Sequence, residues 1–145
     1  MKGFAVTREG RVDPAWIDGN GHMNVMWYTA LFDAGCDALL RRVGITPETI
    51  AAGAPTVVAA RIMTAHRREL RLGDAWQLWS GLSRVEPAGL GFVHRLVSGG
   101  VTCATCEIQA QAFCPVTRRA TSLGGDVMAR ARGFLVPGLT PTVCR

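Results

Sequence analysis

The pattern of apolar and polar positions in this 145-residue chain changes near Pro55. Before that point, polar residues recur at every fourth position, at Thr29, Asp33, Asp37 and Arg41. This spacing predicts a helix over residues 24–43 with only a narrow stripe facing water. We expect other structure to surround this helix almost completely, because apolar side chains cover most of its remaining circumference: Met26, Ala30, Phe32, Cys36, Leu39, Leu40 and Val43.

The ends of the predicted helix carry capping signals. Asn20 or Asn24 can cap its start, and Gly44 is placed to end it. Asp37 and Arg41 are one turn apart and can pair on the exposed stripe. Another helical turn is expected at 48–52, after Pro47.

Residues rich in β-branched and aromatic side chains follow Pro55, and a short strand over 4–11 precedes the helix. We expect four successive strands over 56–72, 75–85, 89–98 and 101–114, separated by turn residues and forming an antiparallel meander. One face of the last strand would be small and apolar, which lets a helix approach closely: Ala104, Cys106, Ile108, Ala110 and Ala112.

These elements predict an α+β fold, a curved antiparallel sheet of about five strands wrapped around a long central helix. A single domain over 1–133 would include a closing helix near 122–132, and an extended tail would follow over 134–145. The sheet would leave an edge exposed, so pairing with a second copy is expected.

Composition narrows the classes of function. No apolar run approaches the roughly 20 residues that cross a bilayer, and the first residues lack the apolar core of a secretory signal, so we expect a cytoplasmic protein without membrane contact. Five cysteines at irregular spacing argue against a disulfide framework, and no ligand set for a metal is complete. A net charge of +5 suits an anionic partner; the basic residues are not interleaved with aromatic ones, which disfavours nucleic acid.

Residues 18–24, Asp-Gly-Asn-Gly-His-Met-Asn, are the strongest candidate for chemistry. They place a carboxylate, glycines and an imidazole where the helix begins, where backbone N–H groups lack partners and the helix dipole attracts negative charge. A reactive carbonyl can be bound there. An ordinary Asn/Gly turn with a capped helix would explain the heptapeptide equally simply.

The longer block over 14–44, with Trp16-Ile17-Asp18 ahead of Asn20-Gly-His-Met-Asn24, resembles the hot-dog fold acyl-CoA thioesterases of the 4-hydroxybenzoyl-CoA thioesterase type. Within that superfamily it is most similar to the branch of carnitine-pathway (betainyl-CoA) thioesterases. The resemblance continues thinly through 68–74, 104–107 and 115–119. It implies hydrolysis of a CoA thioester by a homodimer or homotetramer, with no cofactor or metal.

The resemblance also implies roles for individual residues. Asp18 matches the acidic residue that acts as nucleophile or as base for water, and backbone N–H groups near Asn24 and Val25 can polarise the thioester carbonyl. His22 and Asn24 match positions bordering the site; His22 could equally bond a loop carbonyl. Asn20 and Gly21 belong to the same motif and are expected to contact substrate.

The strand after Pro55 departs from the family pattern. Relatives of this branch carry Glu-x-His followed by Tyr, where this chain has Arg61, Met63 and His66. His66 is a candidate for substrate binding, or a packed strand residue. Glu69 suits a strand-end ion pair.

Arg118 and Arg119 could bind the CoA phosphates or form a solvated basic turn. Two alternatives to a thioesterase remain: a hot-dog protein that binds acyl-CoA without turnover, and a hot-dog enoyl-CoA hydratase.

Overall fold

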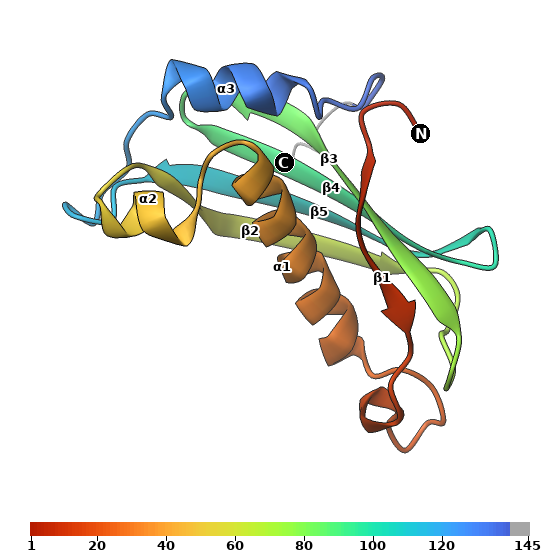
Figure 1. Cartoon of the computed structure of the whole chain (residues 1–145). Helices are drawn as coiled ribbons and strands as arrows, with labels where there is room; N and C mark the ends of the chain where they lie inside the picture. The colour runs from red at the N-terminus through yellow and green to blue at the C-terminus, as the bar shows by residue number, and fades with distance from the viewer. Residues whose placement is uncertain (140–145) are drawn as a thin grey trace.

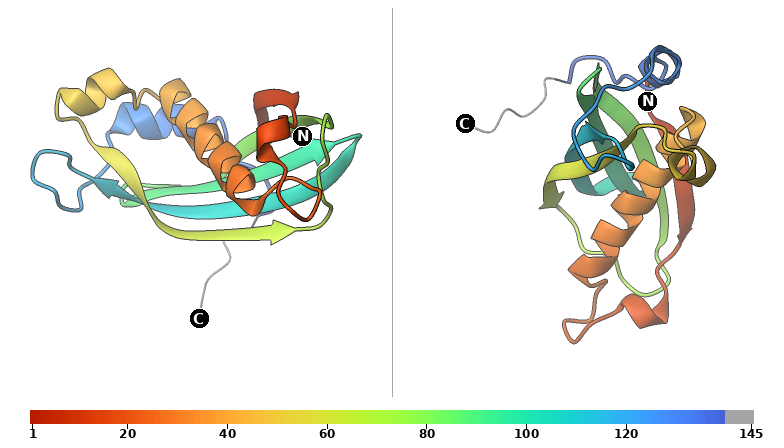
Figure 2. Two further views of the ribbon diagram at one scale, coloured as in Figure 1. Left: turned by 90° about the horizontal axis from the view of Figure 1, so that it is seen from below. Right: turned by 90° about the vertical axis from the view of Figure 1, so that its left-hand side faces the viewer.

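The computed structural model describes residues 1–139 (Figure 1). The strands are β1 (Ala5–Arg11), β2 (Thr56–His66), β3 (Ala75–Glu86), β4 (Gly89–Ser98) and β5 (Val101–Phe113). The helices are the 3-10 turn η1 (Pro14–Trp16), α1 (Val25–Arg42), α2 (Pro47–Ala51) and α3 (Gly125–Arg132). The predicted α+β architecture is confirmed, because α1 lies across the concave face of one curved antiparallel sheet (Figure 2).

The strands are hydrogen-bonded in the order β1-β3-β4-β5-β2. The predicted meander is correct for β3, β4 and β5, and wrong for β2. β2 pairs with β5, from Thr56 opposite Phe113 to His66 opposite Ala104, because β1 occupies the free edge of β3. Neighbours in sequence are usually neighbours in a sheet, and no local signal marks this exception.

The ends of α1 agree with the prediction. The Asn24 side chain accepts a hydrogen bond from the Met26 N–H and so caps the helix. Gly44 follows the helix with φ 91°, the left-handed conformation that favours glycine and ends many helices. Asp37 and Arg41 pair as expected, with 3.0 Å between Oδ2 and Nε.

Only one face of α1 is buried, so the predicted near-complete enclosure is wrong. The helix packs on β1, β3 and β4, and one sheet covers one face of a helix. Met26 is 59% exposed. The side chains buried against the sheet come from Tyr28, Leu31, Phe32, Cys36 and Leu39.

β2 ends at His66, well before the predicted end at residue 72. The N–H groups of Arg67 and Arg68 both donate to the Cys103 carbonyl oxygen, which turns the chain off the sheet edge. Leu70 then lies beside the start of α1: its carbonyl accepts from the Met23 N–H at 2.7 Å, and its N–H donates to the Tyr28 hydroxyl at 3.2 Å.

The alternation predicted for β5 is confirmed, because its small apolar side chains are buried: Ala104, Cys106, Ile108, Ala110 and Ala112. α3 begins at Gly125, later than predicted. The predicted tail over 134–145 begins with residues tied to β3, since the Val136 N–H donates to the Leu82 carbonyl at 2.8 Å; its residues 140–145 lie outside the described residues. No helix in the described part of the chain combines the length and apolarity that crossing a membrane requires.

Candidate active site

A small closed loop precedes α1 and sets the geometry of the candidate site. The Asn24 N–H donates to the Trp16 carbonyl at 2.8 Å, the Asp18 N–H donates to the His22 carbonyl at 3.2 Å, and the Gly21 N–H donates to the Asp18 carbonyl at 3.0 Å. Gly21 adopts φ 79°, which closes the turn without strain because glycine has no Cβ. The loop is therefore fixed by its own backbone.

Aromatic stacking attaches this loop to the helix. The Trp16 ring stacks on Trp27 in the first turn of α1, with centroids 5.2 Å apart and planes 17° apart. Trp76 of β3 also contacts Trp16, with centroids 6.2 Å apart and planes tilted by 35°. Stacked rings of this kind add packing energy beyond their buried area. The loop and the start of α1 consequently form one packed unit.

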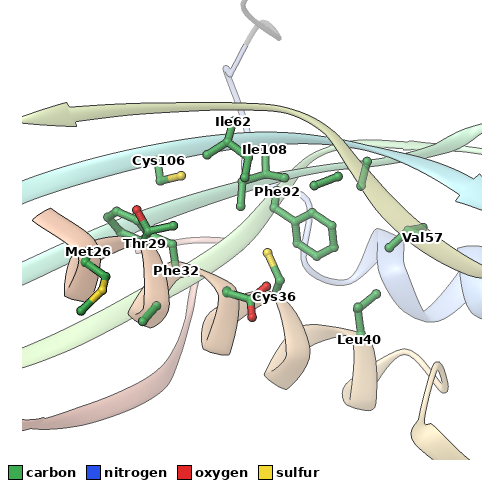
Figure 3. A pocket seen from close by; sticks show the side chains of 14 residues that line it. Met26, Thr29, Phe32, Cys36, Leu40, Val57, Ile62, Phe92, Cys106 and Ile108 are labelled. Carbon is green, nitrogen blue, oxygen red and sulfur yellow. The ribbon is translucent and has the colours of Figure 1, made fainter.

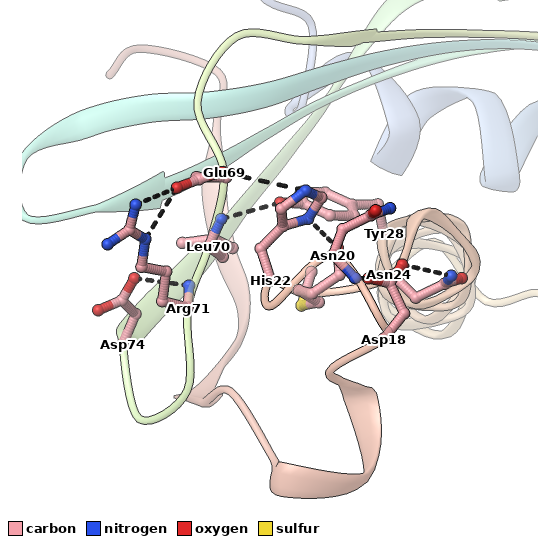
Figure 4. A network of polar contacts seen from close by, with 10 residues as sticks. Asp18, Asn20, His22, Asn24, Tyr28, Glu69, Leu70, Arg71 and Asp74 are labelled. Atoms are coloured by element: carbon pink, nitrogen blue, oxygen red, sulfur yellow. Dashed lines mark hydrogen bonds and ion pairs between the residues drawn. The ribbon is translucent and has the colours of Figure 1, made fainter.

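The Asp18 carboxylate lies at the start of α1 and is held by hydrogen bonds alone (Figure 4). Its Oδ1 accepts from the Asn20 N–H at 2.8 Å, and its Oδ2 accepts from the Asn24 side-chain amide at 2.8 Å. The Asn20 bond, and then the Asn24 bond, lower the pKa of Asp18 below its ordinary 3.8. Within the described residues no Lys or Arg pairs with it, so no cationic side chain there neutralises its charge.

The first free backbone donor of α1 belongs to Val25. The Asn24 N–H is taken by Trp16 and the Met26 N–H by the Asn24 cap, whereas the Val25 N–H has no hydrogen-bond partner among the described residues. Of the two predicted donors, Val25 is thus the available one. A free N–H at the start of a helix can donate a hydrogen bond to a negatively charged atom of a ligand.

A surface hollow of about 340 Å³ adjoins this donor. Val25 and Tyr28 of α1 form one wall, and His66, at the end of β2, forms another. The His66 ring meets Tyr28 edge to face, with centroids 4.7 Å apart. Arg67 and Arg68 follow His66 into the same hollow.

His22 and Glu69 complete this hollow. The His22 ring Nδ1 lies 3.3 Å from the Met23 carbonyl oxygen, the alternative role foreseen for it, and its Nε2 lies 3.9 Å from Glu69 Oε2. Glu69 also accepts from Arg71 Nε at 2.8 Å, so the expected ion pair forms, but in the loop between β2 and β3 and not at a strand end. His22 is therefore oriented by the loop and by Glu69 at once.

Arg118 and Arg119 lie elsewhere. They follow β5, whose end pairs with the start of β2, while the hollow lies by the other end of β2. Asp18 is not among the residues that line the hollow; it is joined to the start of α1 through Asn24. Arg118 has φ 62° and its guanidinium covers the Phe113 ring at 4.9 Å. Within one chain these arginines are not brought together with Asp18.

A second cavity, of about 590 Å³, lies between α1 and the β2 side of the sheet (Figure 3). Its lining is mainly apolar, with Thr29 and Asp33 of α1 as polar members. It exists because α1 packs toward β1 and β3. The apolar residues expected to be enclosed, Met26, Ala30 and Leu40, line it instead. Its other wall comes from the sheet: Val57, Ala59 and Ile62 of β2, Phe92 of β4, and Cys106, Ile108 and Ala110 of β5.

Two features of this region differ from what the sequence predicts. Arg67 and Arg68 fall inside the strand predicted over 56–72 but lie beyond the end of β2; their position next to His66 is the sequence signal that points to them. The cavity had no sequence signal, because it depends on where α1 rests on the sheet.

A curved antiparallel sheet around a central helix, with a carboxylate at the start of that helix, defines a hot-dog protein. Residues 12–131 match the thioesterase-like superfamily, and the chain belongs to that superfamily. No curated protein matches the sequence.

Solved structures share the fold at low sequence identity. A hypothetical protein from Staphylococcus aureus in complex with CoA gives a TM-score of 0.85 at 19% identity, covering 94% of this chain and 89% of that one. A predicted thioesterase from Bacillus stearothermophilus gives 0.79 at 19% identity, covering 90% and 97%. A gentisyl-coenzyme A thioesterase gives 0.75 at 12% identity, covering 85% and 97%.

Proposed function

We propose that this protein is an acyl-CoA thioesterase in which the Asp18 carboxylate is the catalytic group. The observation that carries the proposal is a carboxylate with a lowered pKa, hydrogen-bonded to Asn24, the residue that directly precedes Val25. Among the described residues, this carboxylate has no Lys or Arg partner and the Val25 N–H has no acceptor. Either a nucleophile or a general base must be ionised to work. Membership of the thioesterase-like superfamily and a CoA-bound structural neighbour support this assignment.

The Val25 N–H is the donor that we assign to the thioester carbonyl. Charge builds up on the carbonyl oxygen as Asp18, or a water that it activates, attacks the carbonyl carbon. A donor aimed at that charge lowers the barrier by about 3 kcal/mol. Trapping a mixed anhydride at Asp18 distinguishes the nucleophile from the base.

The apolar cavity supports an apolar acyl group as the substrate class. It lies along α1 from Met26 to Leu40, a length of about 21 Å at 1.5 Å per residue. Arg61 and Met63, the departures from the carnitine-pathway pattern, are not among the residues lining it. If the chain belongs to that branch, we expect it to prefer an aliphatic acyl group over a charged betaine.

Arginines near the hollow are the candidates for the CoA phosphates. Arg67 and Arg68 are exposed and lie beside His66, and guanidinium groups bind phosphate oxygens in pairs. His22 and His66 line the hollow, while Asn20 and Gly21 belong to the turn that holds Asp18. We keep these four residues as our proposed positioning groups. If Arg118 and Arg119 also bind CoA, they belong to a second copy of the chain.

Measurement of free thiol released from a panel of acyl-CoA esters tests the proposal. A thioesterase releases CoA, and we expect aliphatic acyl groups to react best. Loss of the enoyl absorbance without thiol release would identify a hydratase, and binding without either change would identify a non-catalytic acyl-CoA-binding protein. A cytoplasmic location agrees with this substrate.

A further inference from the structure

A hydrogen-bonded series of polar side chains, called the polar series below, runs from the apolar cavity into the sheet. Cys36 Sγ lies 3.2 Å from His94 Nε2, His94 Nδ1 lies 2.8 Å from Ser80 Oγ, and Ser80 Oγ lies 2.7 Å from Thr7 Oγ1. His94 and Ser80 are both 0% exposed. Cys36 is the member that lines the cavity (Figure 3).

Thr7, the member of the polar series farthest from the cavity, fixes the direction of every hydrogen bond in it. The Thr7 hydroxyl donates to the Leu78 carbonyl oxygen at 3.2 Å, so the Ser80 hydroxyl must donate to Thr7. Ser80 therefore accepts from His94 Nδ1, which carries the proton, because each hydroxyl has one proton to give. The lone pair of Nε2 is left to accept the Cys36 thiol proton.

The neighbouring backbone is shaped to hold this arrangement. Gly35 of α1 packs directly against the polar series. A Cβ added at Gly35 would lie 2.7 Å from Ser80 Oγ and 3.0 Å from His94 Nδ1. Burial keeps both partners neutral: burial, then Asp33 and Cys106, raise the pKa of the Cys36 thiol, and burial lowers the pKa of His94 to about 3. A free thiolate is therefore disfavoured, and the thiol proton must move to Nε2 while sulfur forms its new bond. A thiol hydrogen-bonded to an imidazole that a third group orients is the arrangement of a nucleophile with its base.

Cys36 is separate from the proposed hydrolytic centre. It lies 11 residues after Val25 on α1, about 16 Å along the axis. A thioester bound at Asp18 therefore does not place its carbonyl carbon at Cys36. Acyl transfer to the thiol would also require the CoA leaving group inside the cavity, whereas an addition reaction expels nothing.

We propose that Cys36 is a covalent attachment site for apolar chains that end in an α,β-unsaturated carbonyl, with His94 as its base. The cavity supplies the apolar surface that holds the ligand, and two thiols line it, Cys36 and Cys106. Among the described residues, Cys36 has an imidazole at hydrogen-bond distance, whereas the neighbour of Cys106 Sγ is the Thr64 hydroxyl. Cys36 and His94 would thus form a second reactive site, which takes no part in the thioester hydrolysis proposed at Asp18.

The reaction is a conjugate addition that balances without a further reactant. The Cys36 thiol proton passes to His94 Nε2 as sulfur forms a bond to the β-carbon. The π electrons of the carbon–carbon double bond move to the α-carbon and the carbonyl oxygen. Nε2 then returns the proton to the α-carbon, which leaves a thioether and a neutral imidazole.

Labelling with trans-2-decenal, followed by intact-protein and peptide mass spectrometry, tests the proposal. We expect a mass increase equal to the whole aldehyde, located at Cys36, and no such adduct in Cys36→Ser. Loss of water would instead mark an imine at Lys2, the one lysine of the chain, or at the N-terminus. Asp18→Asn should be labelled as fast as the wild type.

Cys114 provides the matched control, because its thiol is less buried and its pKa is lowered by the Thr117 hydrogen bonds. Iodoacetamide, which is small and polar, should label Cys114 first, and Cys114→Ser should leave the decenal reaction unchanged. Decenal that labels Cys36 before Cys114 supports the proposal. Decenal labelling that follows the iodoacetamide order, or that spares Cys36, would overturn it.

The role of His94 has its own readout. Since a neutral imidazole takes the proton, the labelling rate at Cys36 should be nearly flat from about pH 6 to 8, whereas the rate of an ordinary thiol follows its thiolate fraction. Ser80→Ala removes the group that orients His94 and should slow labelling about tenfold or more. A rate at Cys36 that rises about tenfold per pH unit would exclude His94 as the base.

Discussion

Asp18 keeps its negative charge because two donors point at it. The Asn20 N–H and the Asn24 amide hold one oxygen each, and the same Asn24 side chain caps α1. One residue thus couples the start of the helix to the charge of the candidate catalytic group. The sequence predicted a carboxylate near a capped helix start, because caps and glycine turns are local features. It did not predict the hydrogen bond from Asn24 to Asp18.

Substitution of Asn24 should shift the pH at which kcat/KM falls on the acidic side to a higher value. Hydrolysis requires ionised Asp18, so activity falls as pH drops through its pKa, which lies below 3.8 in the wild type. Without the Asn24 amide that pKa rises, and the limb of kcat/KM against pH moves to higher pH. The measurement is a pH–rate series on wild type and Asn24→Ala.

Asn24→Ser separates the two roles of this residue. Serine still caps a helix, so its stability should be near that of the wild type, while Asn24→Ala should lose about 1 kcal/mol of unfolding free energy. Both variants should show the shifted limb. A shift in the alanine variant alone would mean that helix capping, and not the hydrogen bond to Asp18, sets the profile.

His94 should make the stability of the fold depend on pH. Its pKa is lowered to about 3 by burial, so between about pH 3 and 6.5 the unfolded chain binds a proton that the folded chain does not. Stability therefore rises with pH across that window, by about 1.4 kcal/mol per pH unit from this residue. It levels off above the ordinary histidine pKa.

Urea unfolding at pH 5 and pH 7 measures this effect. The free energy of unfolding of His94→Gln should differ less between the two pH values than that of the wild type. His66→Gln, at an exposed histidine, serves as the matched control and should retain the wild-type difference. Equal pH dependence in the wild type and His94→Gln would contradict the account.

At the scale of elements, the position of α1 decides where ligands can bind. Its amphipathic pattern predicted a helix with the right ends, and the pattern could not tell which apolar residues face the sheet. Tyr28 and Leu31 are buried, while Met26 and Ala30 line the cavity. The difference arises because α1 rests toward β1 and β3, a long-range arrangement that helical periodicity does not encode.

Gly35 sets how closely α1 approaches the sheet. In Gly35→Ala the new methyl would lie 2.7 Å from Ser80 Oγ and 2.8 Å from Leu78 Cδ2, so the helix must shift. We expect a loss of about 1–3 kcal/mol from overpacking, although alanine favours helix more than glycine does. Thermal or urea unfolding measures it.

Gly125→Ala in α3 is the control for helix propensity, because an added methyl there meets nothing within 4 Å. It should leave the stability unchanged or raise it slightly. A Gly35→Ala variant as stable as the wild type would show that α1 is not closely fitted to β3 and β4.

At the scale of the whole molecule, β2 is an exposed edge strand of 11 residues. Its apolar side chains Val58, Ile62 and Met63 are 43%, 52% and 38% exposed. Long apolar edges are usually covered, and we expect a second copy of this chain to cover this one. The sequence predicted an exposed edge without identifying its strand, because strand order depends on pairings between segments that are distant in the chain.

Sedimentation of the purified protein tests this assembly. We expect a dimer or tetramer, and Met63→Lys should shift it toward monomer because a charge on an edge strand opposes pairing. Val101→Lys alters an apolar residue of similar exposure, 44%, outside β2 and should leave the assembly intact. A wild-type monomer would contradict the proposed role of the β2 edge.

The most direct test of the central claim is the rate of CoA release by Asp18→Asn on the best acyl-CoA of the panel. Asparagine keeps the size of the side chain and removes its charge, so we expect the fold to persist and turnover to fall by about 100-fold or more. Asp13→Asn, at the nearby cap of η1, should retain activity. Near-normal CoA release by Asp18→Asn would contradict the assignment of this carboxylate as the catalytic group.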